Sequence, residues 1–177
     1  LADLEEGFAL AVRRYELLQK FIRDHFKEGV HYADGKMFGS SKPVLLQAGA
    51  HMIAHAYGYS LLPKVLSGPV AAPADPKEGY TVLVETSVVS PSGRVIGVAY
   101  GSATSTIWSG KQAAFVTRAI DPDKTHNSTL KIAVKRSVVA AVRQSTDAAS
   151  LFTEDVEEGG YGDPAQGKAK ASFLRRK

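Results

Sequence analysis

Residues 80–105 switch the chain from a helical to an extended pattern, and they constrain the fold more than any other segment. The stretch reads YTVLVETSVVSPSGRVIGVAYGSATS, two runs rich in β-branched residues joined by Ser-Pro-Ser-Gly. Such runs around a Pro/Gly turn predict an antiparallel β-hairpin. A hairpin is stable only when something covers its apolar face, so the flanking segments must supply a covering layer.

Helical periodicity on both sides of the hairpin predicts that layer. Apolar residues recur at three- and four-residue steps from Leu4 to Phe26, which predicts a long amphipathic helix over residues 3–28. Its narrow stripe should pack against the sheet or against a neighbouring subunit. Residues 46–58 predict a second helix that ends at Gly58. The predicted class is α+β, with an antiparallel β-hairpin or sheet packed against helices.

Other segments of the chain are less regular. A proline-rich connector, with prolines at positions 63, 69, 73 and 76, follows the second helix. Residues 106–126 are mixed in character. A third helix is expected to follow, capped by His126, Asn127 or Ser128.

This third helix combines small apolar residues with positive charges that have no acidic residue among them in the sequence. Residues 126–146 carry four basic side chains and no acidic one: Lys131, Lys135, Arg136 and Arg143. On a helical wheel, the alanines and serine form a half that can lie flat on a sheet. The four cations fall on the other half, among Ile132, Val139 and Val142. Exposed positions are seldom this apolar, so the pattern indicates the wall of a groove that binds a polyanion; the alternative is that the charges face solvent.

The charge pattern continues in blocks towards the end of the chain. Residues 147–163 carry six acids and no base, and residues 168–177 carry five bases and no acid. We expect a folded domain over residues 1–158 and a flexible basic tail over residues 159–177.

Composition excludes several classes of protein. No run of 18 apolar residues is present, so no membrane span or membrane partner is expected. The chain has no cysteine, which excludes disulfides and thiolate metal sites and fits a reducing compartment. The sequence SGKQ at 109–112 resembles the end of a phosphate loop, but Ser105 stands where that loop requires glycine. No cofactor is expected.

One pair of histidines has the spacing of a metal site. His51 and His55 lie at i, i+4 on the second predicted helix, but Met52 stands where a zinc protease has its general base. Ordinary helix histidines are the favoured interpretation.

Several short motifs together resemble a known family. These are AHAYGY at the end of the second helix, GVAYGSATS in the hairpin, Lys42-Pro43, Gly49-Ala50, and Lys135-Arg136 followed by FTEDV. Their order resembles the Rad-fifty-two-like single-strand annealing proteins, especially the bacterial and phage branch. The resemblance covers roughly residues 25–156.

This resemblance implies a β-β-β-α core over residues 30–156 that assembles into homo-oligomeric rings or filaments. Single-stranded DNA would run in a basic groove between the sheet and the helices. Lys135 and Arg136 match the family's phosphate-binding pair, whereas the next expected basic position is Val139 here, with Arg143 one turn later. The residues expected to contact DNA are Lys135, Arg136, Lys131, Arg143, Lys42, Lys111 and Arg118, with Trp108 and Tyr100 as candidates for base stacking.

The expected function is ATP-independent binding of single-stranded DNA and annealing of complementary strands in recombination or repair, in the cytoplasm of a bacterial or phage-infected cell. It is a binding function and not an enzymatic one. A single-strand-binding protein or a nuclease is a candidate further partner. Two alternatives stay open: an oligomeric scaffold with incidental DNA affinity, and a metal-dependent hydrolase that uses His51 and His55.

Overall fold

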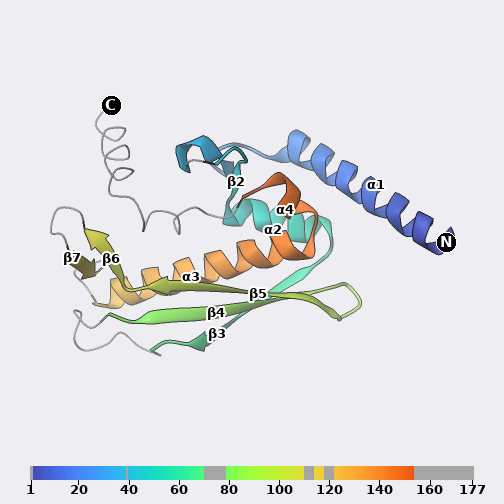
Figure 1. Ribbon diagram of the computed structural model, residues 1–177. Helices are drawn as coiled ribbons and strands as arrows, with labels where there is room; N and C mark the ends of the chain where they lie inside the picture. The colour runs from blue at the N-terminus through green and yellow to red at the C-terminus, as the bar shows by residue number, and fades with distance from the viewer. Residues whose placement is uncertain (1, 39, 70–78, 110–113, 118–121, 154–177) are drawn as a thin grey trace.

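The computed structural model describes residues 2–38, 40–69, 79–109, 114–117 and 122–153 (Figure 1). In chain order, the helices and strands are α1 (Ala2–His25), β1 (Tyr32–Ala33), the 3-10 helix η1 (Gly35–Phe38), β2 (Val44–Leu45), α2 (Gln47–Ala56), β3 (Ser60–Ser67), β4 (Thr81–Val89), β5 (Val95–Thr104), β6 (Thr106–Ser109), β7 (Ala114–Thr117), α3 (Pro122–Ser145) and α4 (Ala148–Leu151). The predicted α+β class is confirmed.

The central layer is an antiparallel sheet with strand order β3-β4-β5. β4 and β5 form the predicted hairpin, with Glu85 opposite Tyr100, and Gly93 adopts a φ of 81° in the turn between them. Every second residue of β4 is buried, so one face of the sheet is covered and the other is not. The covering element is α3, which lies along the sheet in Figure 1.

Small residues let α3 approach β5 closely. A Cβ added at Gly101 would overlap the backbone nitrogen of Ser137, so only glycine fits there. The buried Ser137 hydroxyl lies 2.7 Å from the Thr86 hydroxyl on β4, which pairs two polar groups inside the contact. The prediction that the alanine- and serine-rich half of this helix lies on a sheet is confirmed.

Two sequence expectations about element boundaries are wrong. α3 begins at Pro122, ahead of the predicted caps at 126–128, because proline is well suited to the first helical turn. The predicted connector contains strand β3, in which Pro63 lies opposite Thr86. β3 is an edge strand, where a residue without an amide hydrogen is tolerated. No structure was predicted for the mixed segment after β5, and it contains a second hairpin, β6 paired with β7.

A helical layer covers the C-terminal half of α3 on the side away from the sheet (Figure 1). Its core joins the end of α1, α2, α3 and α4 through these buried residues: Leu18, Leu45, Ala50, Ile53, Ala54, Val138, Val139, Val142, Ala148 and Phe152. At its margin, Tyr57 donates a hydrogen bond to the Asp147 carboxylate at 3.4 Å. Burial, and then the Asp147 charge, raise the pKa of Tyr57 to about 12.

α1 belongs to this layer only at its C-terminal end. Leu18 is 3% exposed and Ile22 packs against the core, whereas Leu4 and Phe8 on the same stripe are 59% and 65% exposed. Figure 1 shows the N-terminal half of α1 standing away from the rest of the molecule. This half therefore does not pack on the chain's own sheet, one of the two arrangements that the sequence left open. Within the described residues, no helix is long and apolar enough to span a membrane.

Candidate nucleic-acid interface

The N-terminal half of α3 presents lysines on the side away from the sheet. Lys124 and Lys131 are exposed and Lys135 is half-buried. Their spacing of seven and four residues places them in line on one face of a helix. We refer to these three residues as the lysine row. Lys124 was not among the predicted DNA contacts, because the helix was expected to begin after it. Pro122, which is well suited to a first helical turn, was the signal for the earlier start.

The lysine row ends where the helical layer begins. One and two turns beyond Lys135, the same side of α3 carries Val139 and Val142, which are 3% and 1% exposed against α2 and α4. The apolar residues that the sequence placed among the cations therefore pack within the chain. The row lies along the part of α3 that this layer leaves uncovered.

Arg136 differs from the lysines in where its side chain points. Its Nη1 donates a hydrogen bond of 2.7 Å to the carbonyl oxygen of Ser102 on β5. The prediction that this side chain lies on the half away from the sheet is wrong, because a long arginine can reach sideways from the helix flank to the strand beside it. Arg136 joins α3 to β5 at one border of the row.

Arg143 is also bound to the backbone. Its Nε donates to the carbonyl oxygen of Phe152 at 3.3 Å, which ties α3 to the end of α4. Lys42 is exposed in the loop before β2, and the next residue, Pro43, accepts a hydrogen bond of 2.9 Å from the Thr153 amide. Lys42 and Arg143 thus both belong to the region around the end of α4.

Of the two aromatic candidates, Tyr100 does not gather with the lysine row. Tyr100 is 57% exposed and alternates with the buried Ala99, so it lies on the sheet face opposite α3. A hydrogen bond to Glu85, and then the charge of that carboxylate, raise the pKa of Tyr100. Trp108 is in β6, opposite Phe115 of β7 in the backbone register, and its side chain lies outside the described residues.

Lys111 and Arg118, together with the tail over 159–177, also fall outside the described residues. The histidines of α2 have ring centroids 6.4 Å apart. In the part of the chain that the structure describes, no group of three or more His, Cys, Asp or Glu side chains is placed to hold a metal ion.

Chemically, the lysine row is a line of compact cations on a rigid support. Lysine ammonium groups attract phosphates without reading bases, and a helix fixed along a sheet holds them at set positions.

No protein-family model matches the chain, and no curated protein sequence matches it.

Proposed function

We propose that this protein binds single-stranded DNA along the lysine row and anneals complementary strands without ATP. The observation that carries the proposal is the alignment of Lys124, Lys131 and Lys135 along the part of α3 that the helical layer of the described residues leaves uncovered. Annealing requires that one strand be held by its backbone while its bases stay accessible, and contacts between lysine and phosphate do this.

The resemblance to the Rad-fifty-two-like annealing proteins supports the same proposal. It implies a three-stranded antiparallel sheet and a basic helix. In this chain β3, β4 and β5 form a three-stranded antiparallel sheet, and α3, which follows the β6–β7 hairpin, packs on it. The proposal includes self-association, and the exposure of Leu4 and Phe8 on α1 supports it. Association with DNA in the cytoplasm, and contact with a single-strand-binding protein or nuclease, belong to the proposal as well.

The test replaces Lys131 and Lys135 by alanine and measures binding of fluorescent oligo-dT across a salt series. Each phosphate contact contributes about 0.7 to the slope of log affinity against log salt for single strands, so losing two should flatten the slope by about 1.4. Affinity should fall about equally for every oligonucleotide sequence, and the annealing rate of complementary strands should fall with it.

The matched control is the Lys20→Ala, Lys64→Ala double variant. Both lysines are exposed, one on α1 and one on β3, and the net charge lost is the same. If the two double variants had equal slopes and affinities, the lysine row would not be the DNA contact.

The second candidate is an oligomeric scaffold with incidental DNA affinity, which the exposed apolar residues of α1 also favour. The two functions differ in annealing. A scaffold would bind oligonucleotides weakly and leave the rate of strand pairing at the protein-free value.

A further inference from the structure

The stripe of α1 changes its surroundings halfway along the helix. At its C-terminal end Leu18 and Ile22 pack in the core, but Leu4 and Phe8 are exposed to 59% and 65%. Large apolar side chains at helical spacing on one protruding face are typical of a contact with another protein surface. We call Leu4 and Phe8 the apolar tip of α1.

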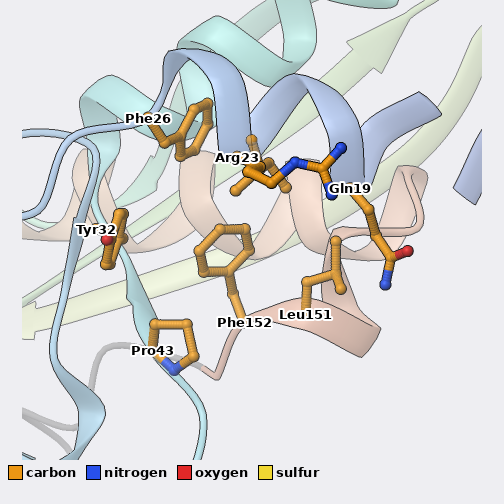
Figure 2. Close-up of a pocket in the computed structure, with 8 residues that line it drawn as sticks. Gln19, Arg23, Phe26, Tyr32, Pro43, Leu151 and Phe152 are labelled. Atoms are coloured by element: carbon orange, nitrogen blue, oxygen red, sulfur yellow. The ribbon is translucent and has the colours of Figure 1, made fainter. Parts of the chain in front are cut away.

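A pocket of about 600 Å³ lies beside the other end of the same helix (Figure 2). It is lined mainly by apolar side chains from α1, the segment after it and α4: Gln19, Ile22, Arg23, Phe26, Tyr32, Pro43, Leu151 and Phe152. Phe152 forms its base, with ring centroids 6.1 Å from Phe26 and 6.5 Å from Tyr32. Figure 2 shows Gln19 and Arg23 together at one side, where they give the pocket a polar edge.

The apolar tip cannot enter the pocket of its own chain. α1 is one unbroken helix from Ala2 to His25. Phe8 and Ile22 are therefore held roughly 21 Å apart along its axis, at 1.5 Å per residue. They lie on nearly the same side of the helix, so a tip that fits this pocket has to come from a second copy.

The charges around the apolar tip and at the pocket edge are of opposite sign. The apolar tip is surrounded by three exposed acids, Asp3, Glu5 and Glu6. The pocket edge carries Arg23, whose side chain is 73% exposed and whose ion pair with Asp24 is 3.6 Å long. A surface pair of this kind contributes little, so Arg23 can exchange it for an acid from a partner. Lys42, next to Pro43, adds a second exposed cation.

We propose that the N-terminal end of α1 from one copy docks in the pocket of a second copy. Leu4 and Phe8 enter the apolar part, and Glu5, which lies on the same side of the helix as Arg23, faces Arg23 of the neighbour. This inference rests on the self-association in the proposed function and names the contact that produces it.

The first experiment measures sedimentation velocity at micromolar concentration without DNA. The Leu4→Glu, Phe8→Glu variant should sediment as a single chain, whereas the parent should associate. The control is Leu10→Glu with Leu17→Glu, which are 50% and 57% exposed on roughly the opposite side of α1. The control should keep the parent's sedimentation, although it carries the same added charge on the same helix.

The second experiment swaps one charge pair. Glu5→Arg and Arg23→Glu should each weaken association when studied alone, and mixing the two variants should restore it. Restoration on mixing requires that the two side chains meet between copies. Circular dichroism of each variant checks that the helices remain folded.

The inference is overturned if the tip variant associates like the parent, or if the parent itself stays a single chain, which would leave the pocket to a different protein. Binding of oligo-dT, measured separately, still decides whether the chain is a DNA-binding protein. A failed docking contact is therefore distinguishable from a failed function.

Discussion

Arg136 is a cation of α3 with a structural role of its own. Its Nη1 bonds to the Ser102 carbonyl at 2.7 Å, and β5 is an edge strand of the sheet. The contact therefore connects the helix to the border of the sheet and satisfies a backbone acceptor there. A variant that removes Arg136 changes stability as well as charge.

Replacing Arg136 by alanine should lower the free energy of unfolding by about 1.5–3 kcal/mol, the range for a hydrogen bond to a charged group. Urea denaturation measures this change. Lys131→Ala removes the same charge from an exposed position and should stay within about 0.5 kcal/mol of the parent. Equal stability of the two variants would contradict the structural role of Arg136.

At the scale of whole elements, the contact between α3 and β5 depends on an alternation of small residues. Gly97, Ala99, Gly101 and Ala103 are the β5 residues directed towards the helix, opposite alternate residues of β4. At Gly101 the atoms nearest to an added Cβ belong to the backbone of α3, which cannot move aside like a side chain. The glycines and alanines of β5 therefore determine how closely α3 approaches the sheet.

Gly101→Ala should push α3 away from the sheet and lower the free energy of unfolding by about 1–3 kcal/mol, the usual range for overpacking. Ser102→Ala changes the neighbouring residue, whose side chain faces the other side of the sheet, and should have little effect. Thermal unfolding followed by circular dichroism compares the two. A Gly101→Ala variant as stable as the Ser102→Ala variant would show that the helix can shift without loss.

The elements that the sequence predicted are those whose pattern is local. Alternation and the Ser-Pro-Ser-Gly turn gave the β4–β5 hairpin, and small residues gave the packing face of α3. β3 was not predicted, because Pro63 is normally a breaker and is tolerated only at an edge, which depends on strand order. The sequence around Pro122 already contained the signal for the start of α3, but the start was predicted at residues 126–128.

In the candidate site too, the features that depend on one helix alone were predicted, and those that depend on neighbouring elements were not. Helical spacing correctly grouped Lys131 with Lys135, since it depends on one helix alone. The hydrogen bonds from Arg136 and Arg143 to backbone carbonyls depend on where β5 and α4 lie. A helical wheel describes one helix and carries no information about the position of other elements. Tyr100 could have been assigned to the far face of the sheet, because it follows the small Ala99 in strict alternation.

At the scale of the whole molecule, the core of the described residues extends to Phe152, inside the acidic block of residues 147–163. The last member of the three hydrophobic clusters among the described residues is Phe152, which lies in the same cluster as Leu18 and Ile53. The predicted tail over 159–177 lies outside the described residues.

A chain that ends at Glu158 should keep the melting temperature of the parent within about 2 °C, because every described cluster is retained. Differential scanning calorimetry of the two chains tests this expectation. Extending the deletion through Phe152 provides the positive control, since it removes a residue that is 2% exposed and should destabilise the fold strongly. Unfolding of the chain that ends at Glu158 would mean that the domain extends further than residue 158.

Because α1 packs in the core only near its C-terminal end, a small rotation there displaces its N-terminal end by a larger distance. The part from Leu18 back to Ala2 projects roughly 24 Å, so a rotation of about 10° at the anchor moves the free end by roughly 4 Å. If copies dock through that end, the angle between neighbouring copies depends on how Leu18, Ile22 and Phe26 pack at the anchored end of α1. The same contact could then join copies at different curvatures, and small changes at the anchored end would decide whether a chain of copies closes on itself or continues.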